Sequence, residues 1–313
     1  MKLVYMGTPD FAVMPLQALV EAGYPVEAVI TQPDKPKGRG KELKPTPVKE
    51  EAQKHGIAVY QPQKVKDPDF IKTLEQIGPD IIIVAAFGQI IPRQVLELPK
   101  FGCINIHASL LPKYRGAAPI QQAVIDGEKE SGVTIMKMSA GLDTGDMIAK
   151  VVVPLDKEET GGSLFDKLAK AGAKLLIETL PSIFDGTAVY EKQPEESPTP
   201  YAGMITKQMG LMDFGKDAWA LERLVRGMDP WPSAYTYLDG KVLKVWKSKV
   251  REEESSSMPG TVLFTDKKGI HVACAKGILV LTEIQLAGKK RMSADAFLRG
   301  YSIKKGTVLG GGE

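Results

Sequence analysis

Apolar runs alternate with helical patterns through the first 190 residues of the chain. The helical patterns are amphipathic, and one of them opens at Thr46-Pro47, with Thr46 as N-cap and Pro47 in the first turn. A longer helix is predicted to begin at Ser163, with Asp166 completing a capping box, and to end near Pro181. The apolar runs predict strands at residues 3–7, 26–31, 57–60, 81–87, 103–107 and 133–138. This alternation predicts an α/β, Rossmann-like, mostly parallel sheet with helices on both faces.

The pattern changes after Gly186. Residues 191–200 are rich in Pro and Glu and are typical of a linker. Beyond them, one helical segment with a single apolar face at 221–228 precedes several short strands, two of which are joined by a tight turn at Asp239-Gly240. We therefore predict an α/β domain over residues 1–189, a linker over 190–205 and a C-terminal small β-barrel domain over 206–313.

Composition narrows the setting in which this chain works. Hydrophobic residues make up 43% and charged residues 25%, as in an ordinary globular protein. No long apolar stretch follows Lys2, and no apolar run approaches the ~20 residues of a membrane span, so we expect neither a signal peptide nor a membrane anchor. The two cysteines, Cys103 and Cys274, lie in apolar stretches and predict buried free thiols in a cytoplasmic protein.

The charge is spread unevenly along the chain. Residues 1–205 contain 23 basic and 26 acidic side chains, whereas residues 206–313 contain 18 and 12. A basic second half is consistent with a polyanionic partner. Ordinary surface variation explains the same numbers, and charge alone favours that simpler interpretation.

Three polar residues stand out as candidate chemistry. Asn105 and His107 are two positions apart at the end of a predicted strand, so their side chains share a face, and Asp143 lies in a loop after a later strand. Singly, each has an ordinary explanation as a core or turn residue. The triplet Asp143-Thr144-Gly145 does not predict an aspartic protease, because that chemistry needs two such triplets and the chain has one. A metal site of His107, Asp143 and Asp146 lacks any spacing signature, so no metal is expected.

Two segments carry a resemblance to a known family. The stretches NIHASLLPKYRGAAPI (105–120) and GVTIMKMSAGLDTGDM (132–147) resemble those of the 10-formyltetrahydrofolate-dependent formyltransferases. The resemblance implies that Asn105, His107 and Asp143 form a catalytic triad. It also implies that a segment of four residues contacts the folate cosubstrate, 10-formyltetrahydrofolate: Ser109, Leu110, Leu111 and Pro112. Residues 87–91 are a second candidate wall of the folate site.

Further likeness extends over most of the chain, to members of the family that act on a charged initiator tRNA and so support translation initiation. It rests on GTPDF (7–11), TQPDKPKGRGKELKPTPVK (31–49), MDPWPSAY (228–235) and AGKKRMSADAFL (287–298). One departure is Asp229 before PWP, where the family often has Asn. The likeness implies that Lys37, Arg39 and Lys41 contact the tRNA and that the C-terminal barrel is OB-like. A monomer is expected.

The triad alone leaves other functions open. A formyltransferase for a small amine, such as glycinamide ribonucleotide or an amino sugar, would carry the same three residues, and so would a formyl-folate hydrolase. A non-catalytic RNA-binding protein built on a decayed enzyme is a third possibility. The basic loop at 34–49 and the basic second half favour tRNA over a small amine, and the intact Asn, His and Asp argue against decay.

Overall fold

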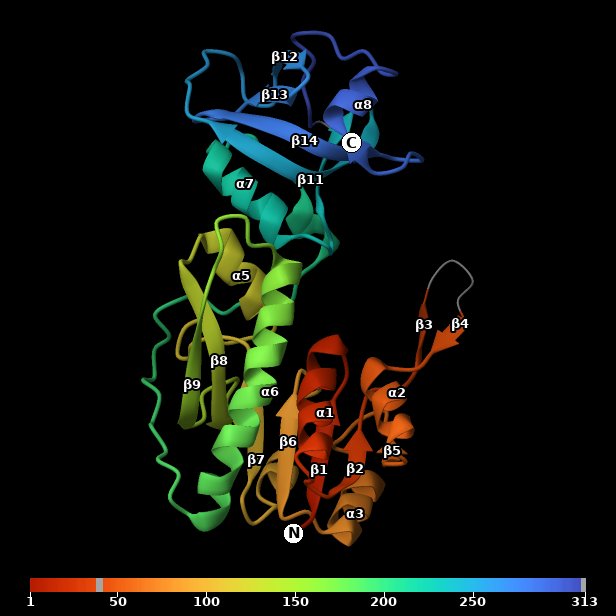
Figure 1. Cartoon of the computed structure of the whole chain (residues 1–313), viewed down its shortest axis with the longest axis vertical. Helices are drawn as coiled ribbons and strands as arrows, with labels where there is room; N and C mark the ends of the chain where they lie inside the picture. The colour runs from red at the N-terminus through yellow and green to blue at the C-terminus, as the bar shows by residue number, and fades with distance from the viewer. Residues whose placement is uncertain (38–41, 311–313) are drawn as a thin grey trace. The chain divides into compact units, whose positions relative to one another are not determined.

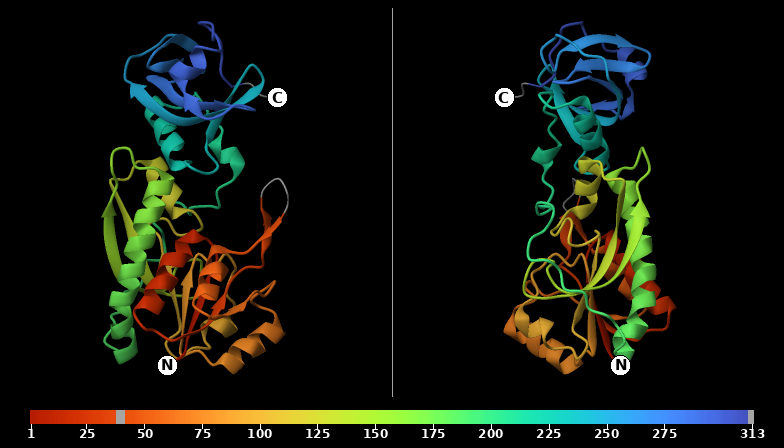
Figure 2. Two further views of the ribbon diagram at one scale, coloured as in Figure 1. Left: turned by 45° about the vertical axis from the view of Figure 1, so that its right-hand side comes forward. Right: turned by 90° about the vertical axis from the view of Figure 1, so that its left-hand side faces the viewer.

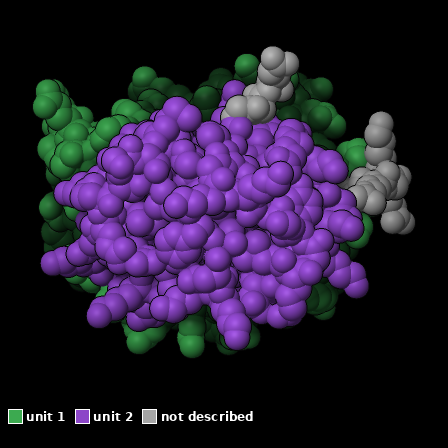
Figure 3. All heavy atoms as spheres, turned by 90° about the horizontal axis from the view of Figure 1, so that it is seen from above, with its two compact units in different colours: residues 1–119, 130–154, 165–202 green, residues 120–129, 155–164, 203–313 purple. Residues whose placement is uncertain are grey.

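The structure, a computed structural model, describes residues 1–37 and 42–310. The chain divides into two compact units, which Figure 3 colours separately. The first unit comprises residues 1–119, 130–154 and 165–202. The second comprises residues 120–129 and 155–164 together with the chain from 203 onward.

The first unit is built around a seven-stranded sheet in the order β5-β2-β1-β6-β7-β8-β9 (Figure 1). The strands β5, β2, β1, β6 and β7 are parallel, whereas β8 and β9 run antiparallel to their neighbours. The predicted Rossmann-like, mostly parallel sheet is confirmed. Its strands are β1 (Leu3–Gly7), β2 (Val26–Ile30), β5 (Ala58–Tyr60), β6 (Ile81–Ala85), β7 (Cys103–His107), β8 (Glu130–Lys137) and β9 (Met147–Pro154).

Helices cover both faces of this sheet (Figures 1 and 2). One face packs on α3 and α4, since Ile71, Leu74 and Val95 share a core with residues of β1, β6 and β7. The opposite face carries α6, where Gly172 permits close packing: a Cβ at this position would lie 3.0 Å from Cγ2 of Ile106. The helices are η1 (Asp10–Ala12), α1 (Val13–Glu21), α2 (Pro47–Lys54), α3 (Pro68–Ile77), α4 (Arg93–Leu96) and α6 (Gly161–Asp185).

The predicted bounds of the long helix were wrong at both ends. Helix α6 begins two residues before Ser163, and the amide N of Ser163 donates to Oγ1 of Thr160 at 3.0 Å. It also continues through Pro181 to Asp185. An internal proline costs about 3 kcal/mol in an isolated helix. Here Leu176, Leu180 and Ile183 are buried on either side of Pro181, and that packing offsets the penalty.

Several elements were not predicted, among them the helices α3 and α4 and the strands β3, β4 and β9. The loop expected between the second strand and α2 contains a short hairpin, β3 (Lys35–Lys37) and β4 (Glu42–Lys44). Strand β9 is eight residues long and pairs with β8, and its alternating exposure marks it as an edge strand. The predicted start of α2 is confirmed, because Oγ1 of Thr46 accepts from the amide N of Lys49 at 3.1 Å.

The second unit contains an antiparallel sheet of six strands in the order β10-β11-β14-β13-β12, with β15 paired to β14. Asp239 and Gly240 both have positive φ, 49° and 71°, and form the predicted tight turn between β10 and β11. Helix α7 packs on this sheet through Leu221 and Val225. The elements are α5 (Pro119–Asp126), η2 (Lys207–Gly210), α7 (Ala218–Gly227), β10 (Ala234–Leu238), β11 (Lys241–Arg251), β12 (Val262–Asp266), β13 (Gly269–Ala273), β14 (Ile278–Leu286), β15 (Met292–Ser293) and α8 (Ala294–Leu298).

Candidate active site

Asn105 and His107 lie on one face of β7 at its carboxyl end, and both are buried, with exposures of 8% and 5%. Nε2 of His107 lies 3.0 Å from the carbonyl oxygen of Tyr114. A carbonyl oxygen can only accept, so Nε2 carries a proton and donates it there. The other ring nitrogen, Nδ1, faces Oδ1 of Asp143 at 3.7 Å. The structure therefore brings His107 and Asp143 together.

The Asn105 side chain is available to a ligand. Within the described part of the chain, its amide group makes no hydrogen bond, and the residue as a whole is 8% exposed. Its amide atoms are not among the fully buried polar atoms without a partner in the described residues, so they are accessible to a ligand. Its NH₂ group can donate to a carbonyl or an oxyanion that enters beside His107.

Asp143 reaches this site by an indirect route. Strand β8 is antiparallel to β7, so its last residue, Lys137, pairs with Ile104 and not with the carboxyl end of β7. The loop from 138 to 146 must run back along the sheet to place Asp143 beside His107. Asp143 adopts a φ of 52°, and its Oδ2 accepts a hydrogen bond from the amide N of Gly116 at 2.9 Å. A non-glycine residue with positive φ at such a position is strained, and surrounding contacts must hold it.

The segment Ser109–Pro112 is held in place by hydrogen bonds to Thr134 of β8. Oγ1 of Thr134, which is fully buried, donates to the carbonyl of Ser109 at 2.7 Å and accepts from the amide N of Leu111 at 3.1 Å. Leu111 is buried in a small cluster with two methionines, while Leu110 and Pro112 are partly exposed. The segment thus presents an apolar surface beside His107, suited to one wall of a site for a flat ring.

The loop after β6 lies where the strand order reverses between β1 and β6, a usual position for ligands in such sheets. Oγ1 of Thr8 donates to the carbonyl of Phe87 at 2.9 Å, and Nε2 of Gln32 donates to the carbonyl of Gly88 at 3.0 Å. Residues 87–91, the second candidate wall, stay a prediction.

The hairpin β3–β4 is tied to the same region. Nζ of Lys35 donates to Oε1 of Gln32 at 2.7 Å, and Asp34 accepts from Lys49 and Gln61, each at 2.6 Å. These hydrogen bonds, that from Lys49 first, lower the pKa of the Asp34 carboxyl. Lys37 is the last residue of β3, whereas Arg39 and Lys41 lie outside the described residues.

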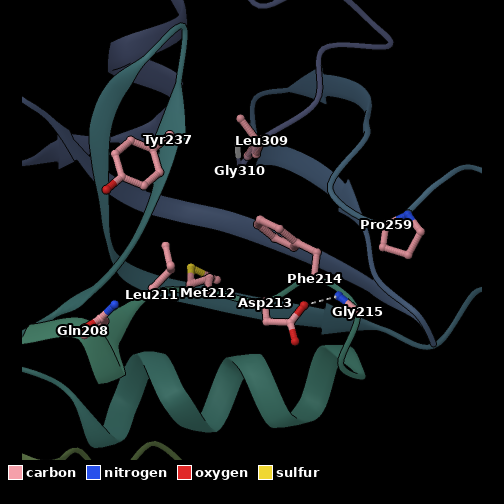
Figure 4. Close-up of a pocket in the computed structure, with 10 residues that line it drawn as sticks. All are labelled: Gln208, Leu211, Met212, Asp213, Phe214, Gly215, Tyr237, Pro259, Leu309 and Gly310. Atoms are coloured by element: carbon pink, nitrogen blue, oxygen red, sulfur yellow. Dashed lines mark hydrogen bonds between the residues drawn. The ribbon is translucent and has the colours of Figure 1, made fainter. Parts of the chain in front are cut away.

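Neither a metal cluster nor a second catalytic centre emerges elsewhere in the described ranges. No group of three or more His, Cys, Asp or Glu residues there could hold a metal ion. A hollow in the second unit has Phe214 and Tyr237 in its lining (Figure 4), but its one carboxylate, Asp213, already accepts from the amide N of Gly215 at 2.9 Å. No described helix is long and apolar enough to cross a bilayer.

Sequence reasoning missed the groups that hold the site together. The carbonyl of Tyr114 and the amide of Gly116 act through the backbone, so residue identity gives no signal for them. Thr134 looked like one position in an apolar strand. Only the tertiary structure shows that these groups face His107, Asp143 and Leu111.

Comparison with known proteins decides the family. A model described as Formyl transferase matches residues 1–180, and one described as Formyl transferase, C-terminal domain, matches residues 204–302. The chain belongs to the formyl transferase family. This formyl transferase is 54% identical over 309 residues to the methionyl-tRNA formyltransferase of Agathobacter rectalis, covering 99% of each chain. It is 50% identical over 310 residues to the methionyl-tRNA formyltransferase of Clostridioides difficile, covering 99% of this chain and 100% of the other.

Solved structures share its fold. The sugar 3N-formyl transferase WlaRD, in the presence of dTDP and 5-N-formyl-THF, matches with a TM-score of 0.67 at 21% identity, over 93% of this formyl transferase and 99% of that chain. HypX of Aquifex aeolicus, in complex with tetrahydrofolic acid, matches with a TM-score of 0.61 at 18% identity, over 98% of this chain and 50% of the other. At these identities the likeness is one of fold.

Proposed function

We propose that this enzyme transfers the formyl group of 10-formyltetrahydrofolate to the α-amino group of methionyl-tRNA, supporting translation initiation in the cytoplasm as a monomer. The observation that carries the proposal is that the accessible amide of Asn105, which makes no hydrogen bond within the described residues, lies on the same strand face as a histidine facing a carboxylate. The choice of methionyl-tRNA over a small amine is supported by relatives with about half of their residues identical over nearly the whole chain.

The chemistry follows from the arrangement of the donors. The α-amine has a free pKa of about 8, so a neutral fraction exists that can attack the formyl carbon. Negative charge then develops on the formyl oxygen, and the amide of Asn105 can donate to it. Since Nε2 of His107 is engaged by Tyr114, the proton that His107 offers to the oxyanion is the one on Nδ1.

Asp143 faces this imidazole and can orient it, because its Oδ1 lies 3.7 Å from Nδ1. The same carboxylate can orient a water molecule that carries the amine proton to the departing N10 of the folate. Ser109, Leu110, Leu111 and Pro112 would contact the folate.

The tRNA assignments belong to the same proposal. Lys37, Arg39 and Lys41 would contact the acceptor end, and the second unit, with an OB-like barrel, would bind the body of the tRNA. The functional division would follow residues 1–189, 190–205 and 206–313.

A direct assay tests the proposal. The full-length protein is offered 10-formyltetrahydrofolate with methionyl-tRNA and, separately, with glycinamide ribonucleotide. Formylation of methionyl-tRNA with little reaction of the small amine is the expected result. Faster reaction of the small amine would replace the tRNA assignment, and folate turnover without an acceptor would indicate a hydrolase.

A further inference from the structure

Gln193 is a buried residue within an otherwise exposed segment. Its exposure is 5%, whereas its neighbours at 192, 194, 195 and 196 are all exposed. The segment was predicted to be a linker, and it is held against the first unit on both sides of Gln193. The amide N of Met147 donates to the carbonyl of Glu191 at 2.8 Å, and Ala202 exchanges backbone hydrogen bonds with the stretch 115–118.

The Gln193 amide donates two hydrogen bonds through its nitrogen and accepts one through its oxygen. Nε2 donates to the carbonyl of Asp143 at 2.9 Å and to the carbonyl of Gly145 at 2.7 Å. Oε1 accepts from Nε of Arg115 at 3.1 Å. Arginine cannot accept and carbonyl oxygens cannot donate, so this orientation of the amide is fixed by its partners.

Arg115 in turn is held by the segment that carries Gln193. It is 1% exposed, and its two terminal nitrogens donate to the carbonyls of Glu195 at 3.0 Å and Pro194 at 2.7 Å. A buried guanidinium that spans three successive residues of one segment sets the position of that segment rigidly. Arg115 therefore fixes where Gln193 stands.

The loop to which Gln193 donates its two hydrogen bonds is the loop that contains Asp143. Asp143 has a φ of 52°, and a Cβ at Gly145 would meet the carbonyl oxygen of Lys137 at 1.8 Å, so the loop is tightly constrained but has an exposed tip at 139–142. The residues flanking Arg115 contact the other side of the site: Tyr114 accepts from His107, and Gly116 donates to the Asp143 carboxylate. One tripeptide and one glutamine thus hold both partners of the imidazole–carboxylate pair.

We propose that Gln193 and Arg115 are positioning residues for the proposed formyl transfer, and that the segment around Gln193 is part of the active-site framework. Gln193 sets the backbone of Asp143, Gly116 sets its carboxylate, and together they determine the distance between Asp143 and His107. The proposal depends on the proposed function only for which reaction the positioned residues serve. The positional effect itself is a property of the protein without substrate.

The kinetic test uses two substitutions that differ in what they remove. Gln193→Ala removes both donated hydrogen bonds and the acceptor for Arg115. Gln193→Glu keeps the side-chain volume and pairs with Arg115, but an ionised carboxylate cannot donate to the two loop carbonyls. Because displacements near 1 Å at a catalytic group cost about 10²-fold in rate, both variants should lose about tenfold to 10²-fold in kcat, with little change in KM for the folate. Glu196→Gln, an exposed change three residues away, should keep the wild-type kcat.

A purely architectural role gives a different pattern. If Gln193 only anchored the segment to Arg115, Gln193→Glu would retain the wild-type kcat, since the anchor would be preserved as an ion pair. That result would overturn the proposal. Gln193→Glu also carries the test by itself if Gln193→Ala does not fold.

A substrate-free measurement separates this proposal from the proposed function. The chain has three histidines, so the ring signals of His107 can be assigned in an NMR spectrum with a His107→Gln variant. Both Gln193 variants should shift the His107 ring signals and leave those of His55 and His271 in place. Unchanged His107 signals would overturn the proposal even if wild-type enzyme formylates methionyl-tRNA. Shifted signals in a protein that does not formylate methionyl-tRNA would support the positioning role and reject the substrate.

Discussion

At the scale of single residues, His107 is oriented by a contact at each of its two ring nitrogens. His107 donates through Nε2 to a backbone carbonyl and turns Nδ1 toward Asp143, so one ring is oriented and available to substrate at once. The amide of Asn105 makes no hydrogen bond within the described residues and is accessible to a ligand. Sequence spacing was enough to propose the pair Asn105 and His107, because alternation along a strand dictates a shared face. It could not indicate how Asp143 would reach them.

The first prediction concerns the triad. Asn105→Ala, His107→Ala and Asp143→Ala should each lower kcat by about 10²–10³-fold, because each removes or disorders a group that stabilises the developing oxyanion. If the three act as one unit, the double substitutions will cost much less than the product of the single effects. Steady-state kinetics with methionyl-tRNA, beside circular dichroism of each variant, measure this. A variant that is folded and turns over at the wild-type rate removes its residue from the mechanism.

The two cysteines give a second prediction at this scale. Burial raises the pKa of the Cys103 thiol to about 12 and that of Cys274 to about 11. The reactive thiolate is therefore scarce at neutral pH and increases only as the pH rises toward those values. Alkylation by iodoacetamide at pH 8 should be far slower in the native protein than in urea, where an ordinary thiol pKa of about 8.5 returns. Equal rates in the two conditions would show that the thiols are accessible.

At the scale of elements, the strands β3 and β4 extend away from the sheet of the first unit (Figure 1), and hydrogen bonds anchor the base of this hairpin. Lys35 is bound by Gln32, and Asp34 binds Lys49 at the start of α2, so the hairpin has defined supports at both ends. The sequence indicates a basic loop but not its strands, since three-residue strands containing Pro36 and lysines lack any apolar alternation.

The third prediction tests the basic residues between 37 and 41. Arg39→Ala should lower kcat/KM for methionyl-tRNA and leave the affinity for folate unchanged, because arginine can both pair with phosphate and stack on a base. Lys37→Ala and Lys41→Ala should chiefly flatten the dependence of tRNA affinity on salt, by a slope of about 0.7–0.9 for each phosphate that is no longer neutralised. Filter binding over a series of salt concentrations measures the slope. A silent Arg39→Ala with wild-type salt dependence in both lysine variants would leave tRNA binding to the second unit alone.

At the scale of the whole molecule, the segment 191–202 belongs with the first compact unit, even though its composition is that of a linker. Ala202 donates to the carbonyl of Arg115 at 2.8 Å and accepts from the amide N of Ala117 at 2.7 Å. The stretch 120–129 likewise groups with residues beyond 203, although it lies far earlier in sequence. Neither grouping follows from local pattern.

The fourth prediction compares two truncated chains. A chain ending at residue 205 should melt at a higher temperature than one ending at 200, because only the longer one keeps the hydrogen bonds of Ala202 with 115–118. Both should bind the folate, since the proposed folate contacts precede residue 150. Both should bind tRNA poorly, because residues 206–313 hold the excess of basic side chains. Calorimetry and tRNA binding check these points, and full tRNA affinity in either chain would contradict the assignment of the second half.

The sequence by itself determined the class of sheet, the positions of six of the seven strands of that sheet, the turn at Asp239-Gly240 and the candidate pair on β7, because periodicity, glycine and capping are local properties. Only the tertiary structure decided that β8 is antiparallel to β7, that α6 passes through Pro181, and that Gln193 and Arg115 meet beneath Asp143. Each of these outcomes depends on groups many residues apart in the chain. Their free energy comes from burial and hydrogen bonds that exist only once those groups are packed together.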